Sequence, residues 1–244
     1  MVLSVQSLSK SFGAVQVADN VSFNIKAGEA VGIIGPNCAG KTSLFNLISG
    51  DLAPDSGRIE IDRNDVTGLS TRQRSRLGVA RTYQVPLPFI GLSVFENVLV
   101  AAVFSAKPAG ESAEDRSIEV LSRTGLLRRV DSLAGTLTLL DRKRLELARA
   151  LATRPKLLLL DEIAGGLTEA ECHELIELIQ AIIHDGTTVL WIEHIVHALV
   201  KVVNHLIVLD RGCIVAAGEP HSVLNSPQVR EIYLGLEPDT EELH

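Results

Sequence analysis

The stretch of the sequence with the clearest chemistry is GPNCAGKT, residues 35–42. It fits the pattern G-x-x-x-x-G-K-S/T, in which glycines allow the backbone to approach a ligand closely. In such a loop, successive backbone N–H groups and the positive end of a following helix bind phosphate oxygens. A lysine neutralises the outer phosphates, and a hydroxyl ligates Mg²⁺. We therefore predict a nucleotide and Mg²⁺ site, with Thr42 on the metal, built from Gly35, Pro36, Asn37, Cys38, Ala39, Gly40, Lys41, Thr42 and Ser43.

A cysteine stands inside this loop, at a position where a residue without a side chain would be the easiest choice. If the position needs a positive φ, Cys38 costs about 1 kcal/mol. A thiol beside a helix N-terminus is expected to be more acidic than usual, so one hypothesis is that oxidation of Cys38 weakens nucleotide binding. The alternative is that the loop simply tolerates a small residue. For the loop as a whole, the alternative is a chance glycine-rich turn.

An acidic pair, Asp161 and Glu162, directly follows the apolar run LLLL. Ligands of open α/β sheets collect at the carboxyl ends of strands. We expect Asp161 to hold Mg²⁺ through water and Glu162 to polarise an attacking water, with a helix N-cap as the alternative role. His194 follows another buried run and is expected to hydrogen-bond a γ-phosphate, unless it is only a capping or surface histidine. A metal pair of His194 and His197 is disfavoured because no further ligand has a suitable spacing.

Alternating strands and helices position these side chains. Apolar or alternating runs predict strands at residues 3–6, 21–25, 30–34, 156–160, 188–192 and 205–209. Helical patterns cover residues 41–49, closed by Gly50, and residues 169–184. The alternation predicts an α/β fold with a largely parallel sheet.

The predicted organisation is a single domain over residues 1–244. Residues 1–83 and 138–236 form its catalytic core, which ends in short helices over residues 219–236. Residues 84–137, with helical stretches at 94–104 and 113–127, form an inserted helical subdomain. The acidic tail, residues 237–244, is expected to fray.

Composition narrows the possible classes of protein. A chain of 244 residues with 46% hydrophobic residues can bury a sizeable core. The net charge of -7 and the lack of a Lys/Arg run argue against a nucleic acid as the main partner. Three cysteines without paired spacing suit a reducing cytosol. Neither an export signal nor a bilayer-spanning segment is visible, so a soluble protein is expected.

Taken together, these motifs resemble the ATP-binding subunits of ABC transporters over nearly the entire chain. Residues 35–42 match the Walker A motif, residues 157–162 match Walker B with its glutamate, Gln84 in RTYQVP matches the Q-loop, and His194 matches the switch histidine. The resemblance implies a P-loop ATPase of the ABC type that uses ATP and Mg²⁺. It implies a mixed, mostly parallel sheet with an N-terminal antiparallel portion and an inserted helical subdomain.

The resemblance also implies roles for individual side chains. Gln84 would touch Mg²⁺ and the attacking water, and Lys41, Gln84 and His194 would stabilise γ-phosphate charge. Phe12 would stack on adenine, with a core aromatic as the alternative. Gln84 could otherwise be a plain turn residue.

Three longer stretches look like subunits of branched-chain amino acid importers and of relatives that move other amino acids, amides or urea: ARTYQVPLPFIGLSVFENVLVAA, RLELARALATRPKLLLLDEIAGGL and GEPHSVLNSPQVREIYLG. This likeness implies transmembrane permease subunits as partners, a solute-binding protein outside the cytoplasm as an indirect partner, and a peripheral location on the cytoplasmic face of the membrane. The charge-poor residues 85–102 fit a surface that docks a permease helix, or else the packed interior of the subdomain.

The family's signature LSGGQ is replaced here by Leu137, Thr138, Leu139, Leu140 and Asp141. In the family, this segment lies at a helix N-terminus that reaches the ATP of a partner subunit. Thr138 keeps a hydroxyl for that ATP, but both glycines are leucines and the glutamine is acidic. We therefore expect a heterodimer with a second, different ATPase subunit, with a homodimer as the alternative. Ile163 and Thr168 also depart from the usual proline and acid, which affects fine geometry.

The sequence thus predicts an ATP hydrolase that powers uptake of branched-chain amino acids or a similar small solute. Two alternatives remain open. One is a non-transport ABC-type ATPase or nucleotide switch that acts on nucleic acid or ribosomes. The other is a weakly hydrolysing subunit of an asymmetric heterodimer, for which Cys38 and the altered signature are the reasons.

Overall fold

The computed structural model describes residues 1–105 and 111–234. Its strands are β1 (Leu3–Phe12), β2 (Val15–Ile25), β3 (Ala30–Ile34), β4 (Ser56–Ile61), β5 (Asn64–Asp65), β6 (Val79–Arg81), β7 (Leu157–Asp161), β8 (Thr188–Ile192), β9 (His205–Asp210) and β10 (Cys213–Gly218). Its α-helices are α1 (Lys41–Ser49), α2 (Thr71–Arg76), α3 (Val94–Phe104), α4 (Ala113–Arg123), α5 (Leu139–Ala152), α6 (Glu169–His184), α7 (Val196–Val200), α8 (Pro220–Leu224) and α9 (Pro227–Leu234). Two 3₁₀ turns lie at Leu127–Arg129 and Ala134–Thr136.

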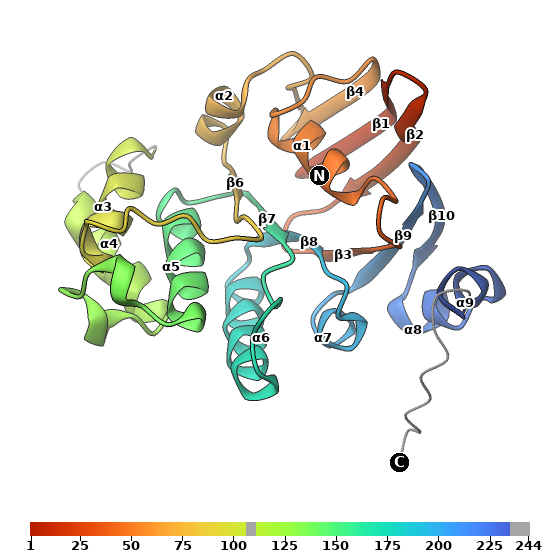
Figure 1. Cartoon of the computed structure of the whole chain (residues 1–244). Coiled ribbons are helices and arrows are strands. Elements are labelled where there is room, and N and C mark those ends of the chain that lie inside the picture. The colour runs from red at the N-terminus through yellow and green to blue at the C-terminus, as the bar shows by residue number, and fades with distance from the viewer. Residues whose placement is uncertain (106–110, 235–244) are drawn as a thin grey trace.

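The strands form two sheets (Figure 1). The larger sheet has the order β10-β9-β3-β8-β7-β6, and its strands pair in parallel except for β10. The smaller, antiparallel sheet has the order β2-β1-β4-β5 and lies in the N-terminal part of the chain. The predicted fold class, a mixed and mostly parallel sheet with an N-terminal antiparallel portion, is confirmed.

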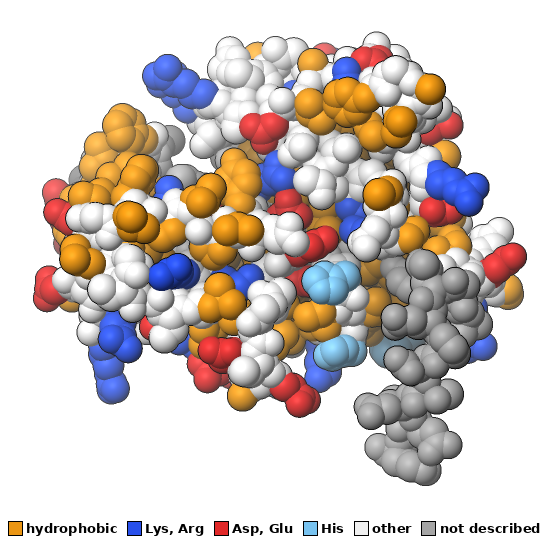
Figure 2. All heavy atoms as spheres, in the orientation of Figure 1, with side chains coloured by type: hydrophobic (Ala, Val, Ile, Leu, Met, Phe, Trp, Pro, Cys, Tyr) orange, Lys and Arg blue, Asp and Glu red, His pale blue; other side chains and the backbone are white. Residues whose placement is uncertain are grey.

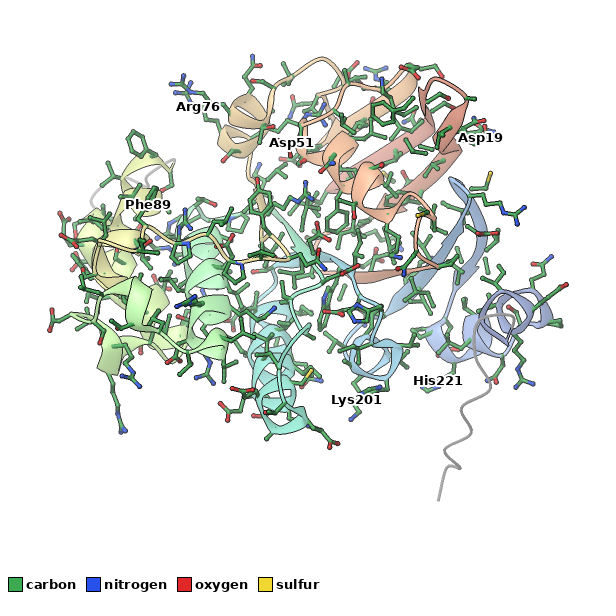
Figure 3. All side chains as sticks on the ribbon, viewed as in Figure 1. Asp19, Asp51, Arg76, Phe89, Lys201 and His221 are labelled. Carbon is green, nitrogen blue, oxygen red and sulfur yellow. The ribbon has the colours of Figure 1, made fainter. Side chains whose placement is uncertain are left out.

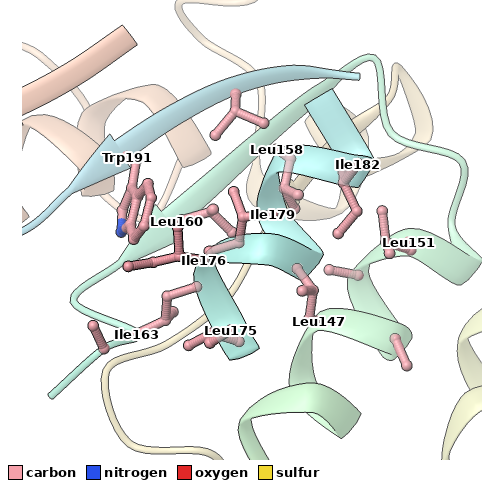
Figure 4. Packing of buried hydrophobic residues seen from close by; sticks show 14 of the residues in the cluster. Leu147, Leu151, Leu158, Leu160, Ile163, Leu175, Ile176, Ile179, Ile182 and Trp191 are labelled. Atoms are coloured by element: carbon pink, nitrogen blue, oxygen red, sulfur yellow. The ribbon is translucent and has the colours of Figure 1, made fainter. Parts of the chain in front are cut away.

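The central strands are apolar throughout because both faces of the large sheet are covered. In β7, Leu157 and Leu159 belong to the core on one face, while Leu158 and Leu160 belong to the core on the other. The first core is shared with α1 and the antiparallel sheet, and the second with α5 and α6. Figure 4 shows this second core, in which leucines and isoleucines of both helices pack on β7 and Trp191. Successive side chains of a strand point to opposite faces of the sheet. When both faces are buried, every side chain enters a core, and apolar residues are favoured throughout the strand.

Helices α3, α4 and α5 pack side by side at one end of the molecule (Figure 1). α3 begins with a capping box, in which the Ser93 hydroxyl accepts from the Glu96 N–H and the Glu96 carboxylate accepts from the Ser93 N–H. α4 is shorter than the predicted helix over residues 113–127. It ends at Arg123 because Gly125 adopts a φ of 74°, a conformation that stops a helix. The predicted tail, residues 237–244, lies outside the described part of the chain.

The helix that follows the phosphate-loop motif is fixed at its far end by a buried arginine. α1 ends at Gly50, as the sequence predicted, with a φ of 88°. Arg74 of α2 donates to the carbonyl oxygens of Leu47 and Ile48 at 2.6 and 2.9 Å, and to that of Thr67. The carbonyl groups of Leu47 and Ile48 lie in the last turn of α1 and have no N–H partner within that helix. Arg74 therefore caps the end of α1 that points away from the loop.

Candidate functional site

Residues 35–42 connect the carboxyl end of β3 to the first residues of α1, as predicted. Two glycines are required by close packing. A Cβ on Gly35 would lie 2.1 Å from the carbonyl oxygen of Leu209, and a Cβ on Gly40 would lie 2.2 Å from that of Val17. Gly40 precedes α1 with a φ of 100° and no side-chain cap. The N–H groups of the first helical turn are therefore left for a ligand, an arrangement that suits a phosphate.

Lys41, the first residue of α1, is almost completely buried, with 7% of its surface exposed. Its ammonium donates hydrogen bonds to the carbonyl oxygens of Gly35 (2.7 Å) and Pro36 (2.9 Å). Burial lowers the pKa of Lys41, and the nearby Glu162, Cys38 and Asp161 act in the opposite direction. The loop thus curls around a cation that is largely desolvated, which strengthens its attraction for an anionic ligand.

Cys38 is exposed and has a φ of 66°, so the position does require the left-handed conformation. A side chain in this conformation is strained by about 1 kcal/mol relative to glycine. The thiol lies on the open side of the loop, next to Ala39 and Gly40 in the wall of a cavity.

The acidic pair lies at the carboxyl end of β7. Asp161 is the last residue of the strand and is 5% exposed. Glu162 has a φ of 45°, and its N–H donates to the carbonyl oxygen of Ile192 on β8 at 2.9 Å. The side-chain amide of Gln84 donates to the Glu162 carboxylate at 2.8 Å. The carboxylate is therefore held by a residue that enters from the segment after β6.

His194 follows β8, and its Nδ1 lies 3.8 Å from the carboxylates of both Glu162 and Glu193. Glu193 is fully buried, and its carboxylate accepts from the N–H groups of Ala164 (2.8 Å) and His194 (3.3 Å). Burial raises the pKa of Glu193, while these N–H groups and His194 oppose that shift. Glu193 thus joins the turn that follows Glu162 to the turn that carries His194.

A cavity of about 260 Å³ lies over the loop. Its walls are residues 37–43 of the loop, Glu162, and two valines of β2, Val15 and Val17. The available oxygen ligands are the Thr42 hydroxyl and the carboxylates of Asp161 and Glu162, which suit Mg²⁺ beside a phosphate chain. The structure therefore brings the loop and Glu162 together around one space, while Asp161 ends the strand that precedes Glu162.

Phe12 ends β1 at the hairpin to β2 and is half exposed. The ammonium of Lys10 lies 5.4 Å from the centre of its ring. Phe12 is therefore not a core aromatic, which was the alternative. The valines that line the cavity, Val15 and Val17, lie on the strand after it and were not identified from the sequence.

The altered signature lies at the N-terminus of α5. Thr138 is the N-cap, and its hydroxyl accepts from the Asp141 N–H at 3.2 Å. Leu139 is exposed, whereas Leu140 is 7% exposed and belongs to the core. Asp141 lies between two arginines, with oxygens 3.9 Å from Arg129 and 3.7 Å from Arg144. Of the two leucines, only Leu139 therefore alters the exposed surface at the start of α5. The negative charge of Asp141 is balanced by Arg129 and Arg144.

α5 also contacts the segment that carries Gln84. Arg149 donates to the carbonyl oxygen of Leu87 at 3.0 Å, and its guanidinium lies over the ring of Phe89. Glu146 is buried, which raises its pKa, and the N–H groups of Tyr83 and Leu87 face its carboxylate and oppose that shift. Helix α5 thus carries the altered signature at its N-terminus and contacts the segment after Gln84 through Arg149, near its C-terminus.

The fold and this site together define the class of the protein, an α/β ATPase with a phosphate-binding loop and an inserted group of helices. The family model described as ABC transporter matches residues 18–165. The chain belongs to the ATP-binding subunits of the ABC transporter family, whose members bind ATP and hydrolyse it to drive transport.

Curated relatives match over nearly their whole length. The high-affinity branched-chain amino acid transport ATP-binding protein LivG of Salmonella typhimurium is 37% identical, over 96% of this chain and 98% of the relative. The corresponding protein BraF of Pseudomonas aeruginosa is 33% identical, with the same coverage of both chains.

Solved structures agree with these relatives. The ADP conformation of an ATP-binding cassette of an ABC transporter is 31% identical, with a TM-score of 0.88 over 96% of this chain and 98% of that one. A dimeric post-hydrolysis state of another cassette, bound to ADP and phosphate, is 25% identical, with a TM-score of 0.77 over 89% of this chain and 98% of that one. Among the residues that the structure describes, none of the helices combines the length and the apolar character that a membrane-spanning segment needs.

Proposed function

We propose that this chain is the ATP-hydrolysing subunit of an importer for branched-chain amino acids or a related small solute. The observation that carries the proposal is a cavity lined by both the phosphate loop and Glu162. The names of the relatives LivG and BraF support amino acids as the transported solute.

The positions of the side chains support the proposed chemistry. The loop N–H groups and Lys41 hold the β- and γ-phosphates, and Glu162 polarises the attacking water. Lys41, Gln84 and His194 stabilise the charge that develops on the γ-phosphoryl group. Phe12, exposed at the end of β1, is proposed to stack on adenine.

Mg²⁺ fits the oxygen-rich side of the cavity. Thr42 would bind it through its hydroxyl, Gln84 through its side-chain oxygen, and Asp161 through a water molecule. When bound, the metal supplies positive charge to the phosphate oxygens during transfer. The amide nitrogen of Gln84 already donates to Glu162, so its oxygen is free to face a metal.

A permease subunit is the proposed membrane partner, and it would hold the chain on the cytoplasmic face of the membrane. Apolar side chains gather over the helical part of the molecule in Figure 2. Val85, Leu87 and Ile90 are exposed, whereas Val94 and Val98 are buried. The charge-poor stretch, residues 85–102, is therefore divided between interior and surface, and its exposed members suit a docking partner. A solute-binding protein would act through the permease, and nucleic acid is not proposed as a partner.

A second, different ATPase subunit is the proposed dimer partner. In a head-to-tail dimer, each ATP lies between the phosphate loop of one subunit and the signature of the other. Thr138 is exposed at the N-terminus of α5 and would reach the ATP of the partner. The exposed Leu139 leaves less room for a phosphate than a glycine, so the two sites of the dimer are expected to differ.

Phosphate release by the purified chain, alone and with its candidate permease and second ATPase in vesicles, tests the transport proposal. We expect hydrolysis to rise when a branched-chain amino acid and its binding protein are present on the outside. Hydrolysis that ignores the permease but rises with RNA or ribosomes would favour the nucleotide-switch alternative.

Sedimentation of Glu162→Gln with saturating ATP tests the dimer. We expect the chain alone to remain largely monomeric and to dimerise with the second subunit. Tight homodimers with two equivalent nucleotides would contradict the asymmetric assembly.

A further inference from the structure

One buried cation next to the acidic pair has no part in the roles described so far. Arg81 is the last residue of β6, three positions before Gln84. Its guanidinium donates to the Asp161 carboxylate at 2.7 Å, through Nη2 and Oδ2. The side chains of Arg81 and Asp161 are only 8% and 7% exposed, so the ion pair is shielded from water. Breaking such a pair leaves a buried charge without compensation, which is strongly unfavourable.

The guanidinium is fixed from several sides. Its Nη1 donates to Asn46 of α1 at 2.6 Å and lies 3.3 Å from the carboxylate of Asp51. Asp51 follows α1 and lies between α1 and α2 (Figure 3). The Cζ atom of Arg81 also lies over two aromatic rings, 5.7 Å from the ring centre of Phe45 and 5.1 Å from that of Tyr83. A planar, delocalised cation suits such a site better than a flexible ammonium does.

The pair fixes the orientation of Asp161. A carboxylate that accepts a hydrogen bond from a metal-bound water molecule must present one oxygen to it in a defined direction. Arg81 holds Oδ2 of Asp161 and is itself attached to α1, the helix that carries Lys41 and Thr42. The oxygen that remains, Oδ1, is therefore held in a fixed position relative to α1, which carries Thr42, one of the other proposed metal ligands.

We infer that Arg81 is a positioning residue for the metal, which holds the Asp161 carboxylate in the direction needed to bind hydrated Mg²⁺ beside the nucleotide. The inference rests on the proposed function. Arg81 acts through Asp161 and does not touch substrate. Loss of a side chain that orients a metal-binding group typically weakens metal affinity by 10–100-fold. Because Asp161 acts through water, the smaller figure applies.

The test uses the full chain and two variants, Arg81→Gln and Arg81→Lys. Mn²⁺ replaces Mg²⁺, and its binding in the presence of ADP is measured by electron paramagnetic resonance. ADP binding without metal is measured in EDTA. We expect the Mn²⁺ concentration at half-saturation to rise about tenfold in Arg81→Gln. The rise should be smaller in Arg81→Lys, because lysine keeps the positive charge but lacks the planar set of donors of the guanidinium. ADP affinity in EDTA should change by less than about twofold.

Arg74→Gln is the matched control, since Arg74 is a buried arginine that binds carbonyls of α1 and does not contact Asp161. It should lower stability without changing the Mn²⁺ requirement. An unchanged Mn²⁺ requirement in both Arg81 variants, or an equal rise in Arg74→Gln, would overturn the role of Arg81. If Arg81→Gln fails to fold, Arg81→Lys decides by the same criterion. Wild-type protein that binds no ADP would instead contradict the proposed function itself.

Discussion

The side-chain amide of Gln84 donates a 2.8 Å hydrogen bond to the Glu162 carboxylate, although 78 residues separate the two in the chain. The contact exists because Gln84 follows β6, Glu162 follows β7, and these strands pair in parallel. Parallel strands bring their carboxyl ends to the same edge of a sheet. The residue expected at the metal thus lies against the residue expected to activate water.

Replacing Glu162 by glutamine tests its role as the base. The variant keeps the size of the side chain and removes its charge, so we expect ATP affinity to change little. Phosphate release should fall by about 10²–10⁴-fold, since a general base contributes that much. Glu177→Gln, an exposed carboxylate on α6, is the control. Equal release by Glu162→Gln and wild type would show that Glu162 does not catalyse.

Replacing Lys41 by methionine separates binding from stability. The ammonium of Lys41 is desolvated by burial, so its removal relieves an unfavourable term in the nucleotide-free protein. We expect the melting temperature without nucleotide to stay the same or rise, and ATP to cause no thermal shift. Lys201→Met, an exposed lysine, should keep the shift caused by ATP. A fall of several degrees without nucleotide would mean that the bonds to Gly35 and Pro36 outweigh the burial.

Replacing Cys38 by glycine tests backbone strain in the loop. The residue has a φ of 66°, so glycine should raise the free energy of unfolding by up to about 1 kcal/mol. Cys38→Ala keeps a Cβ in the same conformation and should bring no such gain. Chemical denaturation of the three proteins measures the difference. An equal gain in both variants would show that the thiol, and not the backbone, is the cause.

The same cysteine allows a test of oxidation. Alkylation of the exposed thiol should weaken ATP binding in wild type and have no effect in Cys38→Ala. Isothermal titration of ATP before and after treatment with N-ethylmaleimide measures this. Unchanged affinity in alkylated wild type would remove the hypothesis of a redox-sensitive loop.

The pH dependence of stability tests the buried Glu193. Burial raises the pKa of Glu193 in the folded protein above the ordinary value of a glutamate, so the folded state binds a proton more tightly than the unfolded state. This contribution to stability is fully present below the unfolded pKa and is lost as pH rises through the folded pKa. The melting temperature of Glu193→Gln minus that of wild type should therefore increase with pH above about 4.5. A difference that is constant or falls with pH would contradict the raised pKa.

The parts of the fold with the strongest pattern could be predicted. β3, β7 and β8 are buried along their whole length and almost entirely apolar, with Asp161 at the end of β7 and Thr188 at the start of β8 as exceptions, and α1 and α6 begin and end where the sequence indicated. β6 was missed because it has only three residues, and β4 because three of its six residues are exposed. Short or one-sided strands depend on their neighbours for stability, which local sequence does not reveal.

The site shows the same division. The loop, the acidic pair, Gln84 and His194 could be picked out because each belongs to a short motif. Arg81 could not, because its role depends on the pairing of β6 with β7 and on the approach of α1. Nor could the sequence show that Leu140 faces the core while Leu139 faces outward, since both are leucines at the start of one helix.

Helix α5 has a consequence for communication between subunits. A helix of 14 residues is about 21 Å long and moves as one stiff rod. Thr138 is the N-cap of this helix and lies at the surface proposed to contact the partner subunit. Near the other end, Arg149 donates a hydrogen bond to the carbonyl oxygen of Leu87, three residues after Gln84. A tilt at the Thr138 end would therefore be transmitted to the segment that carries Gln84. Through α5, the nucleotide bound between the two subunits would influence the position of Gln84 and thereby the rate of hydrolysis in this chain.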